Sequence, residues 1–276
     1  MSSHTKSLVA ARCAPQQIGP VVTCLDDVAE SEIQWLWPGY IPLGHITLLV
    51  GCLSEGKSPL ACEMAARVTV GAPWPDGSPC PSGSVIIASS RNPGDTIHEA
   101  LKEYNADLRR VHPVSAVRTT GADGNPQWVP FRIDDVSGLD RAIKSVPDCR
   151  LIVIDHIESF IGCHSANRFR RSLTLVADFA KRHGTAVLAI TYGLRNIKSI
   201  INAAKVGYGI NSFAFAVWHV YHDTRNRRRR LLLPGKNSLA TKRNGLAFTI
   251  NFESPTIVWE REPVATNDNS SPTSRR

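Results

Sequence analysis

Eight consecutive residues carry the clearest chemical signal in the chain. They match the pattern G-x-x-x-x-G-K-S/T at every fixed position and are Gly51, Cys52, Leu53, Ser54, Glu55, Gly56, Lys57 and Ser58. The two glycines let the backbone curl so that its N–H groups can point at phosphate oxygens. Lys57 can then reach the outer phosphates of a nucleotide, and the Ser58 hydroxyl can ligate Mg²⁺. The stretch therefore predicts a phosphate-binding loop.

Metal chemistry at such a loop needs a second anchor, an acid at the end of a neighbouring buried strand. Asp155 ends the apolar run "LIVID" at 151–155. There it can hold Mg²⁺ through water or together with the Ser58 hydroxyl. The alternative is an aspartate that only caps the next turn. Beside an intact loop we favour the metal role, so Lys57, Ser58 and Asp155 form the predicted core of the site.

The elements around the loop alternate between strands and helices. The apolar run 46–50 predicts a strand that ends in the loop, and a four-residue apolar spacing predicts a helix over 57–70 that Gly71 stops. Further strands are expected at 85–89, 151–155 and 186–191. Further helices are expected after a cap at Asp95 or Thr96, from Ser137 to Val146, and up to Gly184. Continuous apolar strands between amphipathic helices are typical of an α/β fold with a mostly parallel sheet covered on both faces.

The character of the sequence changes from about residue 213. Four strand-like runs follow with few helical segments between them: "FAFAVWHVY", "RLLLP", "LAFTINF" and "TIVWE". We expect antiparallel strands at this end of the sheet, the last two joined by a hairpin around 253–255. The expected organisation is an N-terminal arm at 1–30, one domain at 31–261 and a disordered tail at 262–276.

Composition excludes several classes of protein. The 276 residues are 42% hydrophobic and 20% charged, as in ordinary globular proteins. No apolar run approaches the roughly 18–20 residues that span a bilayer, and no signal peptide is recognisable, so a cytoplasmic protein is expected. The seven cysteines form no C-x-x-C pair, which argues against a zinc site or a disulfide scaffold.

The chain resembles a known family, the RecA-like P-loop ATPases of the AAA-25 or RepA kind. The resemblance covers most of residues 34–250 and rests on blocks that match in order: "WLWPGYIPLGHITLLVG", "GAPWPDGSPCPSGSVIIAS", "LIVIDHIESFIG", "FAKRHGTAVLAIT" and "LPGKNSLATKRNGLAFTI". It implies a RecA-like P-loop NTPase core, ATP and Mg²⁺ as ligands, and assembly into a ring. The family is related to hexameric replicative helicases, so the resemblance also implies a DNA-associated ATPase.

The sequence departs from the family at the residue that activates water. The family typically reads S-A-E-D after the second strand, whereas this chain has Arg91 in place of the glutamate. A guanidinium cannot accept a proton, so Arg91 cannot be a general base. Glu158 or His156, just after Asp155, can take over that role, or hydrolysis is impaired. Arg91 can instead bind the γ-phosphate, which strengthens binding and leaves hydrolysis slow.

Three further positions bear on the ligand. Pro59 follows Ser58 and has no backbone N–H to offer a phosphate, which weakens binding without abolishing it. Arg195 stands where the family often carries His-x-Asn-Lys and keeps only the positive charge. Lys236, in "PGKNSLA", corresponds to a lysine that reaches a neighbour's nucleotide in ring-forming relatives, although a solvated lysine is an equal alternative.

The excess of basic over acidic residues bears on the partners of the protein. The net charge is +8, and a block of arginines lies between two expected late strands, where we expect a hairpin loop: Arg227, Arg228, Arg229 and Arg230. Such a block can neutralise several nucleic-acid phosphates, or it is a solvated face. Two functions stay open, a DNA-associated ATPase and a nucleotide-holding structural or regulatory protein without hydrolysis. A third, an interaction module with a relic loop, is opposed by the unbroken loop pattern.

Overall fold

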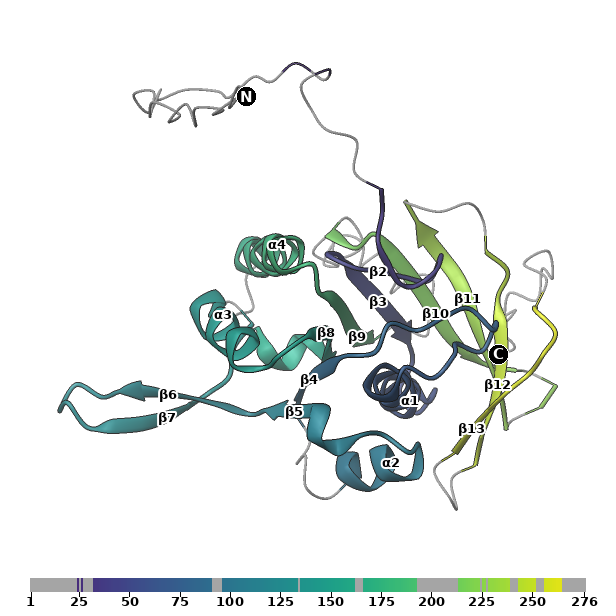
Figure 1. Ribbon diagram of the computed structural model, residues 1–276, viewed down its shortest axis with the longest axis horizontal. Helices are drawn as coiled ribbons and strands as arrows, with labels where there is room; N and C mark the ends of the chain where they lie inside the picture. Colours follow the sequence, from purple (N-terminus) through teal and green to yellow (C-terminus); the bar gives the residue numbers. More distant parts are fainter. Residues whose placement is uncertain are drawn as a thin grey trace, which may run out of the picture. The chain divides into compact units, whose positions relative to one another are not determined.

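The computed structural model describes Cys24, Asp26 and residues 32–90, 96–133, 135–161, 166–192, 213–223, 225–226, 228–238, 243–251 and 256–264 (Figure 1). The chain divides into two units, Met1–Glu32 and Ile33–Arg276. All of the helices and strands named below belong to the second unit.

A nine-stranded sheet forms the centre of this unit, in the order β13-β12-β11-β10-β3-β9-β8-β4-β5. Its parallel part consists of β3 (Ile46–Gly51), β4 (Ser84–Ser89), β5 (Val111–Val114), β8 (Cys149–Asp155), β9 (Ala186–Tyr192) and β10 (Ala216–His222). Its antiparallel end consists of β11 (Arg229–Asn237), β12 (Leu246–Asn251) and β13 (Thr256–Trp259), and begins with the pairing of β11 to β10. The expected mostly parallel sheet with antiparallel strands at the C-terminal end is confirmed.

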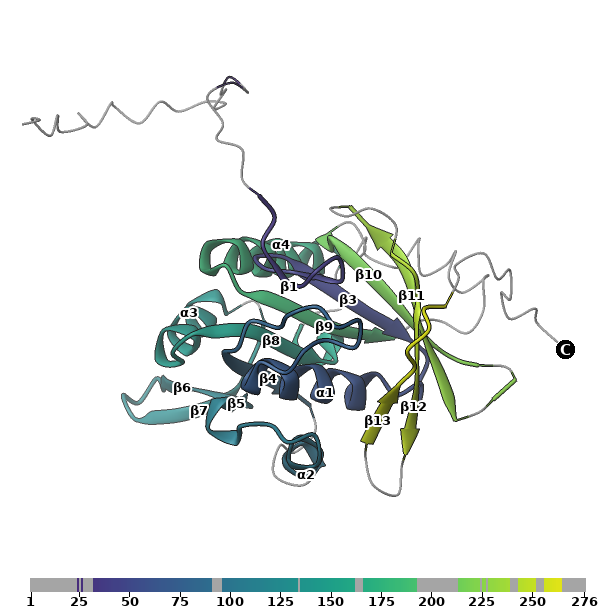
Figure 2. The same ribbon diagram turned by 45° about the vertical axis from the view of Figure 1, so that its right-hand side comes forward.

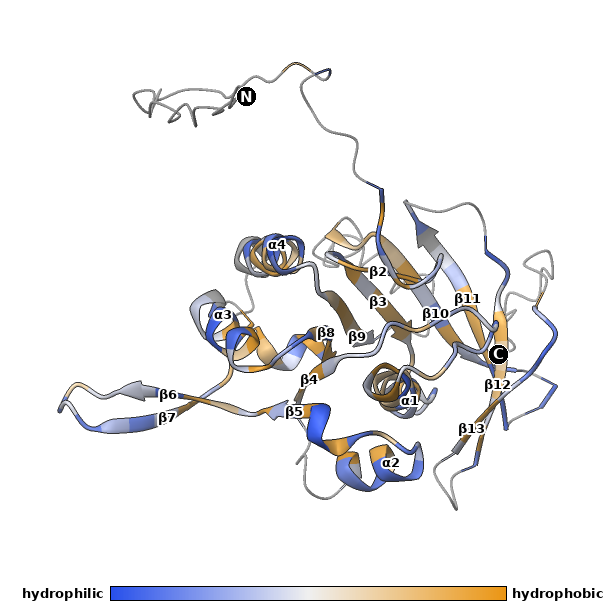
Figure 3. Cartoon of the chain, viewed as in Figure 1, coloured by the Kyte–Doolittle hydropathy of each residue, from blue (hydrophilic) through white to orange (hydrophobic). Residues whose placement is uncertain are grey.

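Helices cover both faces of the sheet, as Figures 1 and 2 show. Helices α1 (Lys57–Val70) and α2 (His98–Glu103) contribute to one apolar core, and α3 (Val136–Ser145) and α4 (Ala166–His183) contribute to the other. Each central strand supplies both cores because its side chains alternate between the faces. In β8, for example, Leu151 and Val153 face the first core while Ile152 and Ile154 face the second. Figure 3 shows the resulting apolar strands and the amphipathic helices, each with an apolar and a polar side.

Helix α1 has the bounds that the sequence predicts, and Leu60, Met64 and Val68 of the predicted stripe are all buried. Gly71 ends the helix in the left-handed conformation with φ of 68° and donates its N–H to the Arg67 carbonyl. Only glycine adopts this conformation without strain, which explains why the helix stops there.

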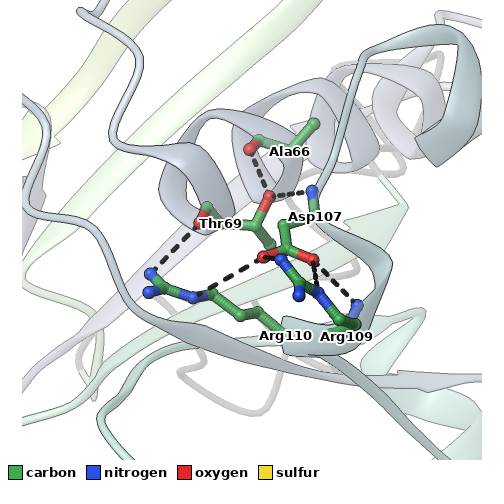
Figure 4. Close-up of polar contacts among 5 residues, drawn as sticks. All are labelled: Ala66, Thr69, Asp107, Arg109 and Arg110. Atoms are coloured by element: carbon green, nitrogen blue, oxygen red, sulfur yellow. Dashed lines mark hydrogen bonds and ion pairs between the residues drawn. The ribbon is translucent and has the colours of Figure 1, made fainter.

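A polar cluster fixes the far end of α1 to the chain that enters β5 (Figure 4). The Thr69 hydroxyl donates to the Ala66 carbonyl at 2.7 Å and accepts from the Asp107 N–H at 2.9 Å. The Asp107 carboxylate in turn accepts from the Arg109 guanidinium at 3.0 Å and 3.1 Å. Helix α1 is therefore held at its end as well as along its apolar face.

One capping prediction is wrong, and a second stays a prediction. Helix α3 starts at Val136, and its cap is Asp135, whose Oδ1 accepts from the Gly138 N–H at 2.9 Å, instead of the expected Ser137. An aspartate before the first turn offers a charged acceptor at the position where the orphan N–H groups need one. A π-helical turn at Thr96 and Ile97 leads directly into α2 at His98. Of the two expected caps, Thr96 belongs to that turn and Asp95 lies outside the described residues.

Other expectations hold. Gly184, with φ of 61°, follows the last residue of α4, and β12 and β13 pair as an antiparallel hairpin from Phe248↔Trp259 to Asn251↔Thr256. The residues around 253–255 that were expected to make the turn lie largely outside the described part of the chain, as do the expected arm and tail.

Two hairpins are present that the sequence did not predict. The first, β1 (Trp35–Trp37) with β2 (Ile41–Pro42), leads into β3. Aromatic stacking anchors it to the sheet, with ring centroids 4.2 Å apart for Trp37–Tyr40 and 4.6 Å apart for Tyr40–Trp218. The second, β6 (Ala116–Thr120) with β7 (Pro126–Pro130), projects from the body of the unit between β5 and α3 (Figures 1 and 2).

Candidate functional site

The carboxyl ends of the parallel strands gather the candidate residues at one edge of the sheet. Gly51 at the end of β3 pairs with Tyr192 at the end of β9, and Ser89 at the end of β4 pairs with Asp155 at the end of β8. Ligands of open α/β sheets bind outside this edge. Loop 51–58 and Asp155, about a hundred residues apart in the sequence, thus lie at the same edge of the sheet. The expectation that their strands are immediate neighbours is wrong, because β9 lies between β3 and β8.

The loop leaves the N-terminus of α1 open. Gly56 precedes the helix with φ of 90°, and no side chain caps the first turn, which also holds no acidic residue. The first N–H groups of a helix and its dipole together attract anions. Pro59, the third helical residue, fits here because the first turn of a helix needs no N–H from this position. The intrahelical hydrogen bonds begin with the Leu60 N–H, which donates to the Gly56 carbonyl at 3.1 Å.

Lys57 lies beneath the loop with 5% of its surface exposed. Its Nζ donates to the carbonyls of Gly51 at 2.7 Å and Cys52 at 2.6 Å, and sits 4.8 Å from the centre of the Tyr192 ring. Burial lowers the pKa of Lys57, and the nearby groups that oppose this fall are Cys52, Glu55, Asp155 and Glu158. The ammonium is desolvated and bonded to neutral carbonyls, which suits it to a polyanionic ligand.

Strands β10 and β11 support the loop from behind. His222 Nδ1 contacts Glu55 Oε2, and the Arg230 guanidinium donates from Nε to the Glu55 carbonyl at 3.1 Å. Arg230 is 2% exposed. His222 was not recognisable as a site residue from the sequence, and Arg230 was expected at a nucleic-acid surface or a solvated face. The only signal for either was their place in strand-like runs whose register with the loop could not be known.

Asp155 and Ser58 supply oxygen atoms of the kind that Mg²⁺ prefers. Asp155 is partly exposed at the end of β8, and the short helix η4 (Ile157–Phe160) after it has His156 at its cap position without a side-chain cap bond. The cap position of that turn is thus His156 and not Asp155, and the metal role of Asp155 stays a prediction. Ser58 is partly buried in the first turn of α1. These residues fit a Mg²⁺ ion that also uses phosphate oxygens and water.

Glu158 lies next to the same edge. The Thr191 hydroxyl, one residue before the end of β9, donates to Glu158 Oε1. Glu158 is also near enough to Lys57 to raise the pKa of that lysine. His156 is in the same group, with Nε2 at 2.8 Å from the Ser159 hydroxyl and its ring centre 4.8 Å from that of Tyr192. Both residues named from sequence as replacements for the missing glutamate are thus beside the loop.

Some predicted site residues lie outside the part of the chain that the structure describes. Arg91, Arg195 and Arg227 are not among the described residues, and of Lys236 only the backbone, in β11, is described. Their assigned roles stay predictions.

The described members of the arginine block have three different environments. Arg228 is exposed, whereas Arg229 binds Glu260 Oε1 at 2.7 Å and Asp223 Oδ2 at 2.6 Å. Arg230 is buried against the loop, as described above. The block was expected on a hairpin loop, but Arg229 and Arg230 belong to β11. Because successive strand residues point to opposite faces, these two cannot form one surface with Arg228.

A comparison with protein-family models gives one match, the model AAA_25, described as an AAA domain, over residues 14–192. The match spans more than half of the 276 residues. The chain belongs to the AAA_25 family. The suggested family is thus confirmed, and the α/β architecture agrees with a P-loop NTPase-like fold. AAA_25 membership makes the chain an ATPase-type nucleotide-binding protein.

A search of curated proteins found no match. Within the described residues, no helix has the length and apolar character needed to cross a membrane.

Proposed function

We propose that this AAA_25 protein binds ATP with Mg²⁺ at loop 51–58 and hydrolyses it, with Glu158 as the general base. One observation carries the proposal. Glu158 is hydrogen-bonded to Thr191, which pairs with Val50 beside the loop, so that Lys57, Asp155 and Glu158 share one edge of the sheet. A cation, a metal-type carboxylate and a second carboxylate at an open helix N-terminus are the parts that phosphoryl transfer needs.

Each residue has a role in this proposal. The N–H groups of the loop and the start of α1 hold the phosphates, and Lys57 binds their outer oxygens. Ser58 and Asp155 would hold Mg²⁺, which when bound neutralises phosphate charge. Arg91 and Arg195 are proposed to add positive charge near the γ-phosphate, and Lys236 is proposed to reach the nucleotide of a neighbouring subunit in a ring.

The chemical step needs a group that accepts the proton of the attacking water. Glu158 takes that proton as the water oxygen bonds to the γ-phosphorus and the bond to the ADP oxygen breaks. Arg91 cannot do so because it keeps its own proton. The Thr191 hydrogen bond supports this role by fixing one Glu158 oxygen, while the Glu158 side chain as a whole is exposed to water.

A second candidate is a protein that holds ATP without cutting it, as a structural or regulatory ligand. It is favoured by the replacement of the family's glutamate with Arg91 and by the Thr191 contact, if that contact keeps Glu158 away from the γ-phosphate.

Phosphate release from ATP and Mg²⁺ separates the two. The measurement compares wild type with Glu158→Gln, and with Glu99→Gln as a matched control, since Glu99 is exposed on α2. The proposal expects release by wild type and the control, and a fall of about 100-fold or more for Glu158→Gln. Wild type that binds ATP without release establishes the second candidate. Equal rates in Glu158→Gln and wild type exclude Glu158 as the base.

We further propose that the protein works with DNA in the cytoplasm, as a replication or helicase-type ATPase that forms a ring. The net charge of +8 and the resemblance to helicase relatives support this part. Filter binding of a labelled oligonucleotide at two salt concentrations tests it, since phosphate contacts make affinity fall steeply with salt.

A further inference from the structure

The β6–β7 hairpin carries an exposed tryptophan on a rigid support. Its turn is closed by the Gly121 N–H, which donates to the Asn125 carbonyl at 2.7 Å, and the Asp123 carboxylate accepts from the Asn125 backbone at 3.0 Å. Val117 packs against the second core at the base of the hairpin. Trp128 stands between the two with 72% of its surface exposed. An indole this exposed offers a flat apolar face to a partner, and a single exposed ring marks a contact surface only together with a second feature beside it.

Strand register places one arginine beside that tryptophan. Arg118 pairs directly with Trp128, so the two side chains lie on the same face of the hairpin. Arg118 is exposed and, within the described residues, makes no ion pair. The acids closest in sequence are engaged locally, Asp123 with Asn125 and Asp107 with Arg109. The face is therefore an aromatic ring next to an uncompensated cation.

The β7 edge of the hairpin argues against strand addition by a protein partner on that side. Pro126 and Pro130 begin and end β7 and have no N–H to offer a further strand. They also flank Trp128 on its own face, two residues away on each side, and leave the indole open from above. A partner that binds this face meets the ring and the guanidinium together, which suits a flat ring linked to an anion.

We propose that the Arg118–Trp128 face of the hairpin binds single-stranded nucleic acid, with a base stacked on the indole and a phosphate on the guanidinium. Aromatic platforms beside cations bind single strands in this way without reading sequence. The exposed Thr119 and Gln127 lie on the opposite face of the hairpin, where they can hydrogen-bond to sugar or phosphate groups of a strand that wraps the edge. The inference rests on the nucleic-acid part of the proposed function and replaces the arginine block as the contact surface.

Fluorescence anisotropy of a labelled 20-nucleotide oligo-dT, titrated with the full-length protein, tests the proposal. Trp128→Ala is expected to weaken binding about tenfold or more, and Trp128→Phe to retain most of the affinity. Arg118→Ala should weaken binding and reduce the slope of log affinity against log salt by about 0.7, the contribution of one phosphate contact. Arg228→Ala, which removes an exposed arginine of the block, is the matched control and should bind as wild type does. Unchanged ATP binding by each variant shows that it has folded.

The outcomes distinguish nucleic-acid association of the protein in general from binding at the hairpin. If wild type binds no oligonucleotide, the nucleic-acid association itself is overturned together with the hairpin site. If wild type binds and the Trp128 and Arg118 variants bind equally well, only the hairpin site is overturned. It is also overturned if these variants change the mass of the protein in light scattering and leave oligonucleotide affinity unchanged, because the hairpin is then a contact between copies of this chain.

Discussion

The Thr191 hydroxyl donates a hydrogen bond to Glu158 Oε1 and so joins the end of β9 to the short helix that follows β8. The two residues are 33 positions apart in the sequence. The bond restrains the carboxylate that we assign as the base, at the edge where the phosphates would lie. Thr191 is thus a positioning residue for Glu158.

Replacing Thr191 with valine removes the hydroxyl and keeps the shape of the side chain. We expect kcat for ATP to fall about tenfold, as for the loss of one hydrogen bond to a charged group, with KM nearly unchanged. Thr191→Ser restores the hydroxyl and should restore kcat. A steady-state series over ATP concentration measures both parameters. A rise in KM at constant kcat would show that Thr191 serves binding instead.

Arg230 and Arg228 give a matched pair of substitutions. Arg230→Met leaves the Glu55 carbonyl without its donor inside the protein, so we expect a loss of about 1–3 kcal/mol in unfolding free energy and weaker ATP binding. Arg228→Met changes an exposed side chain and should stay within about 0.5 kcal/mol of wild type. Urea unfolding followed by circular dichroism measures the difference. Equal losses in both variants would contradict the assigned support of the loop.

The cluster of Asp223, Arg229 and Glu260 predicts a dependence of stability on pH. The pKa of Asp223 is lowered by the Arg225 N–H and by Arg229, and the pKa of Glu260 is lowered by the Arg229 guanidinium. Groups with lowered pKa values stabilise the fold above their ordinary pKa values, here 3.8 and 4.5, and that stability is lost as the pH falls through the folded values.

Arg229→Met tests this cluster. At pH 7 the variant should be less stable by about 1 kcal/mol, a modest figure because the Glu260 side chain is partly exposed. The gap from wild type should shrink as the pH falls below 4.5, where Glu260 begins to protonate in the unfolded chain, and should close as the pH passes the lowered pKa values of the folded carboxylates. Urea midpoints from pH 7 down to 3 measure the gap, and a constant gap would exclude these carboxylates as its source.

Periodicity predicted the parallel sheet and α1 because burial on both faces imposes long apolar runs there. It did not reveal β6 and β7, since an exposed hairpin with prolines and polar residues has no apolar pattern to read. The four consecutive arginines also suggested one basic surface. The alternation of side chains along β11 separates them, and the pairing of Arg230 with Phe248 of β12 could be known only from the register.

The candidate site likewise contains some residues that could be predicted from the sequence and others that could not. The loop and Asp155 were recognisable because the glycines, lysine and strand-ending acid form a local pattern. His222 and Thr191 were not, because each acts through one contact from a distant strand: His222 with Glu55 and Thr191 with Glu158.

The central claim is that loop 51–58 binds ATP, and calorimetric titration of the full-length protein with ATP and Mg²⁺ tests it most directly. We expect saturable binding to wild type and to Lys102→Ala, which removes an exposed lysine of α2. For Lys57→Ala we expect affinity to fall about 100-fold, because the buried ammonium makes charge-assisted hydrogen bonds to the phosphates. Equal affinity in wild type and Lys57→Ala, or no binding by either, would contradict the claim.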